Sequence, residues 1–154
     1  MDREQKLLGE ILLEQGLITA EELKIALDEQ VRSKEFLGKI LLRHGQIREE
    51  DLLAALSEQF KIPVIPLHDK YIDWNLVKSF SASLILDYKC FPVSRDENSV
   101  TVAITDPLNA WAIHKIEEEA RGFPLKLVLV SQGDIDEAIH RYQQYLRQDI
   151  TKWF

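Results

Sequence analysis

The stretch LLGEILLEQGLITAEELKIALDEQ (residues 7–30) returns as FLGKILLRHGQIREEDLLAALSEQ (residues 36–59), with five residues between the two copies. Thirteen of the 24 aligned positions are identical without a gap, which is more than chance matching of common residues produces. A repeat at a fixed period is typical of small supersecondary units that pack on one another. Residues 1–59 are therefore predicted to form a helical subdomain built from two repeats spaced 29 residues apart.

Each copy has the pattern of two short helices separated by a glycine. Residues 8–12 carry an apolar stripe at helical spacing, and Gly16 stands where a glycine commonly ends a helix. Thr19 and Glu22 have the spacing of a capping box, which predicts the start of the second helix. In the second copy Arg48 replaces the threonine, so a weaker cap is expected there.

Gly9 and Gly38 occupy the same early helical position in both copies. A glycine inside a helix costs about 1 kcal/mol relative to alanine. Its retention in both copies predicts a close approach to the backbone at this point, either by a neighbouring helix or by a ligand.

The second half of the chain has a different pattern, which predicts a small α/β sandwich over residues 60–146 with helices packed on one mixed sheet. The whole chain is thus expected to have an α+β fold. Residues 147–154 are interpreted as a tail or linker, with Trp153 and Phe154 as a docking aromatic pair, and Trp74 and Trp111 are expected in the core or half-buried. In chain order the expected elements are an extended segment at 62–67, helices at 73–80 and 83–88, a hairpin of strands 90–93 and 99–104, a helix from Asp106 to Gly122, a central strand at 125–130 and a helix at 133–146.

Composition excludes several classes of function. The 154 residues carry 19 Lys and Arg against 26 Asp and Glu, a net charge of −7 that argues against a nucleic-acid or membrane-surface binder. No apolar run approaches the ~20 residues that span a bilayer, and the N-terminus does not resemble a signal peptide. The single cysteine fits a reducing compartment. A cytoplasmic protein without membrane insertion is expected.

Catalytic and metal-binding patterns are missing from the sequence. There is no Gly-x-x-x-x-Gly-Lys-Ser/Thr run, so the chain has no P-loop of its own and is not expected to be an enzyme. The histidines lack metal-ligand spacing, so no metal or required cofactor is expected. Cys90 is interpreted as a small buried hydrophobic residue, and residues 117–119 as the solvated face of a helix.

The paired 24-residue pattern resembles the MshEN-type domain, the N-terminal domain of type II secretion and type IV pilus assembly ATPases. The segments Phe60–Val64, Phe91–Val93 and Asp106–Asn109 are similar to the α/β part of that family. The resemblance covers residues 6–145. It implies a regulatory domain for protein transport, with an ATPase following in a longer parent chain, located in the cytoplasm and held at the inner membrane through a partner.

In that family the two motifs often bind cyclic di-GMP, with backbone amides at phosphate oxygens, leucines under the purines and glutamine at a guanine edge. Asp106 is the residue of the second half expected to bind guanine. Carried over by position, the resemblance implies a nucleotide-binding site at Leu7, Leu8, Gly9, Leu12, Gln30, Phe36, Leu37, Gly38, Leu41, Gln59 and Asp106.

The sequence departs from the family at the first position of each motif. The family has arginine there, which supplies bidentate and stacking contacts, whereas this chain has Leu7 and Phe36. Phe36 offers a ring for stacking, and a nearby charge is available from Arg3, Lys6, Lys34 or Lys39. Losing two charge-assisted contacts of about 1.5–3 kcal/mol each weakens a ligand by two to four orders of magnitude.

Three interpretations therefore remain. The first is a domain of a secretion or pilus ATPase that docks a protein of the machinery, such as the cytoplasmic part of an inner-membrane component. The alternative is a cyclic di-GMP receptor domain. A third is a stand-alone sensor or adaptor without an ATPase.

Overall fold

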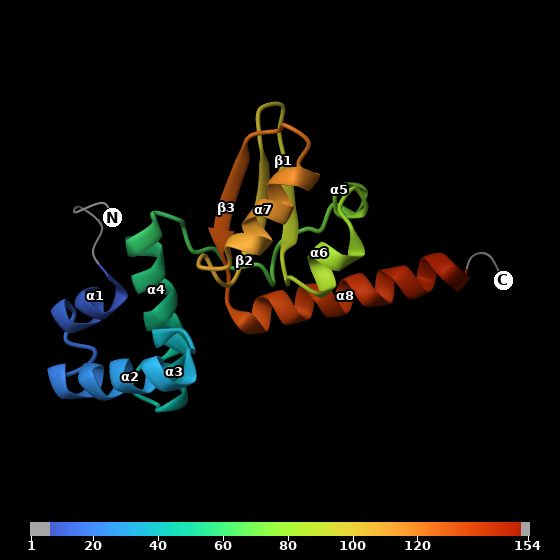
Figure 1. Cartoon of the computed structure of the whole chain (residues 1–154). Helices are drawn as coiled ribbons and strands as arrows, with labels where there is room; N and C mark the ends of the chain where they lie inside the picture. The colour runs from blue at the N-terminus through green and yellow to red at the C-terminus, as the bar shows by residue number, and fades with distance from the viewer. Residues whose placement is uncertain (1–6, 152–154) are drawn as a thin grey trace. The chain divides into compact units, whose positions relative to one another are not determined.

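The computed structural model describes residues 7–151, with side chains through Gln148. The chain forms two compact units, one ending at Ile62 and the other beginning at Pro63 (Figure 1). Over the described residues it contains eight helices and a three-stranded mixed sheet, which confirms the α+β fold. No helix in this range combines the length and apolar character needed to cross a bilayer.

The first unit consists of four helices, two from each repeat (Figure 1). Gly16 and Gly45 both have φ of +71° and follow the first helix of their copy, as predicted. The helices are α1 (Leu8–Glu14), α2 (Ala20–Ser33), α3 (Leu37–Arg43) and α4 (Glu49–Phe60).

The caps of α2 and α4 differ as the sequence predicts. The Thr19 hydroxyl accepts from Glu22 N at 3.1 Å, and the Glu22 carboxylate accepts from Thr19 N at 3.0 Å, which completes the capping box. At α4 only half of this arrangement exists, because an arginine side chain has no acceptor. Asp51 Oδ2 accepts from Arg48 N at 3.1 Å.

The helices of one repeat pack mainly on the helices of the other repeat. Helix α1 contacts α4 and α3, and α2 contacts α3, so each repeat buries its apolar face mainly against the other copy. The residues with 2% exposure or less are Ile11, Leu12, Ala26, Ile40, Leu41 and Ala55. This shared core explains why two copies are needed to form one unit.

The second unit is built on strands β1 (Phe91–Arg95), β2 (Val100–Ile104) and β3 (Leu125–Leu129). Strands β1 and β2 are antiparallel with an irregularity between Pro92 and Ser94, and β2 pairs with β3 in parallel, so the mixed sheet is confirmed. The prediction that 125–130 is the central strand is wrong, because β2 lies between the other two. Beyond β3, Val64 makes a single parallel bridge to Leu129.

The helices of the second unit mostly follow the predicted pattern. They are α5 (Trp74–Lys78), α6 (Ala82–Leu86), α7 (Ala110–Glu119) and α8 (Gln132–Thr151). Helix α7 starts later than predicted: Asp106 Oδ1 accepts from Leu108 N at 2.9 Å to form a turn, and the Asn109 side chain then caps the helix. The expectation that Trp111 is buried is wrong, because α7 buries Ala112 and Ile116 and leaves Trp111 79% exposed.

Helix α8 continues to Thr151, five residues past the predicted end at Leu146, so the first part of the predicted tail is helical. Its buried face includes Ile135, Ala138 and Tyr142, which join the core of the unit. Trp74 stacks on Tyr145 with ring centroids 4.4 Å apart, which fastens α5 to this helix. The predicted aromatic pair at 153–154 lies outside the described residues.

Candidate ligand-binding surface of the helical repeats

The structure brings the beginnings of the two motifs together within the first unit. A Cβ built on Gly9 of α1 would lie 3.6 Å from Leu37 Cδ2, and Leu37 is the first residue of α3. Gly9 and Gly38 are both buried. The motif segments Leu7–Gly9 and Phe36–Gly38 therefore meet where the two short helices begin.

A neighbouring helix explains both motif glycines. A Cβ on Gly9 would lie 2.9 Å from Leu23 Cδ1, and a Cβ on Gly38 would lie 2.6 Å from Leu52 Cδ1. Leu23 and Leu52 are equivalent residues of α2 and α4. Of the two explanations that the sequence left open, close approach by a helix is therefore present in each copy.

Leu7 and Phe36 are the N-cap residues of α1 and α3, and neither side chain caps its helix. They are 47% and 42% exposed. The residue three positions later differs between the copies. Lys39 Nζ lies 6.0 Å from the centroid of the Phe36 ring, a cation–π arrangement, whereas the first copy has Glu10 at this position. The two halves of the surface are therefore electrostatically unequal.

The remaining motif residues of the first unit have different surroundings. Gln30 is half-buried, and its Nε2 donates to Glu35 O at 3.2 Å, which fastens the connector between the repeats to α2. Gln59 is half-buried near the end of α4. Leu12 and Leu41 have no exposed surface, so they support the motif surface from within the core. Leu8 is also buried, and Leu37 is half-buried.

A polar cluster that the sequence analysis did not identify joins the repeats beside this connector. Arg43 Nη2 lies 2.8 Å from Glu29 Oε1 and 3.0 Å from Glu35 Oε1, and His44 Nε2 lies 2.7 Å from Glu29 Oε2. The hydrogen bond from Arg43 is the main reason that the pKa of Glu29 is lowered. The identity of Glu29 and Glu58 in the two copies was the available signal.

These features can be compared with known proteins. The family model of the MshEN domain matches residues 60–149. The chain belongs to the MshEN domain family. The matched stretch includes the described second unit from Pro63 to 149, and the two repeats lie before it.

The MshEN domain is similar to a much longer curated relative, the type IV pilus assembly ATPase PilB of Myxococcus xanthus (strain DK1622). The two are 32% identical over 135 residues, which cover 88% of this chain and 24% of PilB. The chain thus spans about a quarter of the length of that relative.

Solved structures share the fold of this MshEN domain. A structure of MshE with cdg, an abbreviation of cyclic di-GMP, has a TM-score of 0.83 at 24% identity and covers 90% of this chain and 99% of that one. The N-terminal domain of XpsE has a TM-score of 0.67 at 24% identity, covering 87% and 92%.

Asp106, the one predicted site residue of the second unit of this MshEN domain, is half-buried. Its carboxylate holds the turn that precedes α7, as described above. Within the described residues, no three His, Cys, Asp or Glu side chains gather in a way that could hold a metal ion. The paired motifs of the first unit therefore remain the candidate site.

Proposed function

We propose that this MshEN domain is the N-terminal interaction domain of a type IV pilus assembly or type II secretion ATPase. In this role it docks the cytoplasmic part of an inner-membrane component, which holds the parent protein at the inner face of the membrane. The observation that carries the proposal is the alignment with PilB, which takes in 88% of this chain but only 24% of that ATPase. The sequence has no P-loop motif, so the ATPase reaction is assigned to another part of the parent chain.

The exposed motif positions support protein docking over phosphate binding. Leu7 and Phe36 present apolar surface where a dinucleotide phosphate requires cations. Glu10 adds a negative charge to the first copy. Exposed apolar residues rimmed by charged ones are typical of protein contacts.

Direct binding tests this function. The purified chain is titrated by calorimetry with the cytoplasmic region of each inner-membrane component from the pilus or secretion system of the same organism. Saturable binding to one of them is expected. Failure to bind any of them, with the chain shown to be folded by circular dichroism, contradicts the proposal.

A second candidate function is cyclic di-GMP binding, and one observation favours it. The Lys39 ammonium lies over the Phe36 ring. The second copy therefore offers both a cation and a stacking surface at the position where the family has arginine. The solved structure with the highest TM-score quoted above is MshE with cdg. In this second proposal the nucleotide lies across the segments Leu7–Gly9 and Phe36–Gly38, and Gln30 and Gln59 contact its guanine edges.

Arginine restoration separates the two candidates. Calorimetry with cyclic di-GMP is performed on the natural chain and on the double variant Leu7→Arg/Phe36→Arg. If docking is the function, the natural chain does not bind at high micromolar nucleotide, and two restored charge-assisted contacts improve affinity by about 10²- to 10⁴-fold. Micromolar binding by the natural chain that is lost in Lys39→Gln would instead establish the receptor function.

A further inference from the structure

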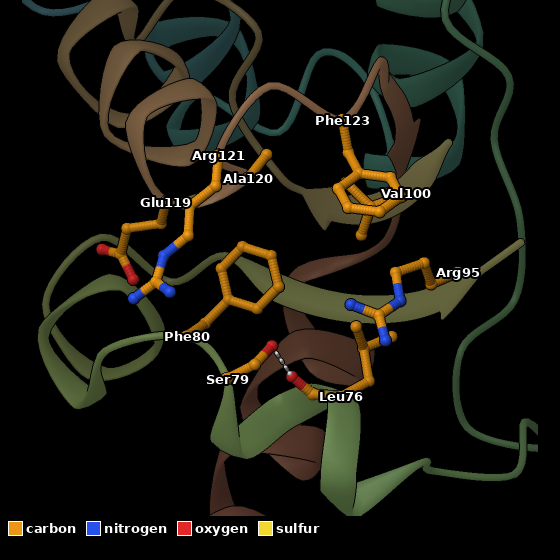
Figure 2. A pocket seen from close by; sticks show the side chains of 9 residues that line it. All are labelled: Leu76, Ser79, Phe80, Arg95, Val100, Glu119, Ala120, Arg121 and Phe123. Carbon is orange, nitrogen blue, oxygen red and sulfur yellow. Dashed lines mark hydrogen bonds between the residues drawn. The ribbon is translucent and has the colours of Figure 1, made fainter. Parts of the chain in front are cut away.

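The second unit contains a small open pocket between β1, β2, α5 and the end of α7 (Figure 2). Its volume is about 130 Å³. The apolar wall consists of buried Leu76, Phe80, Val100 and Ala120. Arg95 and Arg121 reach it from different segments of the chain and lie on either side of the Phe80 ring in Figure 2.

Both arginines are exposed, and neither guanidinium lies within 4 Å of a carboxylate in the described part of the chain. Arg95 instead lies over the Phe123 ring, with Cζ 5.5 Å from its centroid. A guanidinium that stacks on an aromatic face keeps its hydrogen-bond donors available at the edge. Together with Arg121, Arg95 makes the pocket a local positive site on a chain with net charge −7.

One carboxylate, Glu119, also lines the pocket, but it offsets only part of the charge of the two arginines because Lys115 is its ion-pair partner. Glu119 accepts hydrogen bonds from Ser81 N at 2.6 Å and from Ser81 Oγ at 2.8 Å, and Lys115 Nζ lies 3.7 Å away. Glu119 thus binds Ser81, the residue at the N-cap of α6. The expectation that residues 117–119 form a purely solvated face is wrong at this position.

The backbone places Arg121 at the rim. Its φ is +53°, in the left-handed region that disfavours residues with a side chain, and Gly122 follows with φ of +86°. The turn projects the arginine from the end of α7 beside the pocket, which leaves its donors accessible to a partner.

The size and charge of the pocket define what it can hold. Pockets that bury small molecules usually measure about 300–1,000 Å³, so this one is too small for a nucleotide and suits a single apolar side chain. Guanidinium groups bind carboxylates with two parallel hydrogen bonds. We propose that this pocket binds a short acidic peptide segment of the docked partner, with one leucine-like side chain in the pocket and flanking carboxylates on Arg95 and Arg121. The inference rests on the docking function proposed above.

Three synthetic peptides test the chemistry on the complete chain. The first is Asp-Glu-Leu-Glu-Asp, the second replaces leucine with glycine, and the third keeps leucine but has Asn and Gln flanks. Binding is measured by amide shifts in ¹⁵N-labelled protein. The first peptide is expected to shift residues 79–81, 95 and 119–123 and to bind at least tenfold more tightly than the other two. Equal binding of all three, shifts elsewhere, or no binding overturns the proposal.

Matched variants test the two arginines. Arg95→Gln and Arg121→Asn should each weaken the acidic peptide about tenfold, since each removes a hydrogen bond to a charged group. Asparagine tolerates the left-handed conformation at 121, so the turn is preserved. Arg141→Gln, an exposed arginine of α8 outside the pocket, is the control and should bind like the natural chain. Unchanged affinity in both pocket variants contradicts the assignment.

The same variants separate this inference from the docking function. If the natural chain binds an inner-membrane component and only the pocket variants lose it, the pocket is the docking site. If all variants bind that component equally, the pocket assignment fails and the docking function stands. If the natural chain binds the acidic peptide in the pocket but none of the components, the docking function fails instead.

Discussion

His44 Nε2 of the second repeat lies 2.7 Å from Glu29 Oε2 of the first, and the equivalent pair with the repeats exchanged is also in contact. There, Gln15 Nε2 of the first repeat donates to Glu58 Oε2 of the second at 3.1 Å. Such reciprocal contacts are the rule in a two-fold symmetric dimer, where residue i meets j and j meets i. The first unit therefore has the internal arrangement of a dimer joined by a five-residue connector.

The two equivalent glutamates, Glu29 and Glu58, should contribute unequally to the stability of the first unit. Glu29 contacts both Arg43 and His44, whereas Glu58 accepts a hydrogen bond from the neutral Gln15. Glu29→Gln is therefore expected to lower the urea midpoint of the first unit more than Glu58→Gln at pH 7. Far-UV circular dichroism reports on the helices of both units, whereas tryptophan fluorescence reports on the second unit alone because all three tryptophans follow residue 62. A transition seen by circular dichroism but not by fluorescence therefore belongs to the first unit.

The Glu29 contribution also has a predicted pH dependence. Because the pKa of Glu29 is lowered in the folded chain, first by the Arg43 hydrogen bond, its contribution is present above the ordinary value of 4.5. That contribution is lost as pH falls through the folded pKa. The difference between the natural chain and Glu29→Gln should therefore shrink in acid. A difference that grows below pH 4 contradicts this assignment.

The glycine at the start of α3 is predicted to be a packing requirement. In Gly38→Ala the new Cβ would lie 2.6 Å from Leu52 Cδ1 and 3.1 Å from Cδ2. Overpacking of this kind costs about 1–3 kcal/mol, against a gain of up to about 1 kcal/mol from helix propensity. A net loss of about 1 kcal/mol is expected in urea unfolding. In a Leu52→Ala background the same change should be neutral or stabilising, and an equal penalty in both backgrounds would argue against the packing explanation.

The sequence predicted the first unit well because its information is local. The repeat places Gly16 and Gly45 after their helices, and the Thr19 capping box lies within four residues. In the second unit the hairpin was predicted for the same reason: Asp96 Oδ1 accepts from Asn98 N and Ser99 N at 2.7 Å each, so its turn is closed by neighbouring residues.

The predictions of side-chain burial and contact failed where they depend on which face of a helix packs inward, or on residues far apart in the sequence. Trp111 is apolar, but the face of α7 that packs inward is defined by Ala112 and Ile116, so the larger residue points outward. Glu119 meets Ser81 across 38 residues of sequence. Arg95 and Arg121 share a pocket only because the hairpin and the α7–β3 connection fold beside each other. No local sequence pattern predicts contacts between residues this far apart in the chain.

Two predicted site residues should behave as core residues only. Leu12→Ala and Leu41→Ala each remove a side chain with no exposed surface, for which losses of about 2–5 kcal/mol are usual. Their effects should be similar, since the two positions are equivalent in the repeat. Urea unfolding followed by circular dichroism measures the loss. A variant that remains as stable as the natural chain would show that the site collapses without a cavity.

His68 is expected to make the second unit pH-dependent near neutrality. Its pKa is raised first by the hydrogen bond with Asp134 and then by the charges of Asp69 and Asp134, with Glu137 adding to them. A raised pKa gives a contribution that is complete below the ordinary value of 6.5 and is lost as pH rises through the folded value. Tryptophan fluorescence melts between pH 5.5 and 8.5 should show this loss in the natural chain.

The matched control is His68→Gln, which keeps a hydrogen-bond donor for Asp134 but does not titrate. Leu67 N also donates to Asp134 Oδ2 at 2.8 Å, so the segment remains attached to α8 in this variant. The fall in melting temperature between pH 6 and 8 should be smaller in His68→Gln. The same fall in both proteins would assign the pH dependence to another group.

Cys90 is predicted to be unreactive until the second unit opens. It is 1% exposed, and burial raises the pKa of its thiol to about 12. At pH 8 a thiol with that pKa is only about 10⁻⁴ thiolate, and the thiolate is the reactive form. Labelling with a disulfide reagent should therefore be at least about 1,000-fold slower in the native chain than in urea. Native labelling within tenfold of the unfolded rate would mean that the core around β1 opens frequently, and Phe91, its fully buried neighbour, would then be expected to exchange its amide proton equally fast.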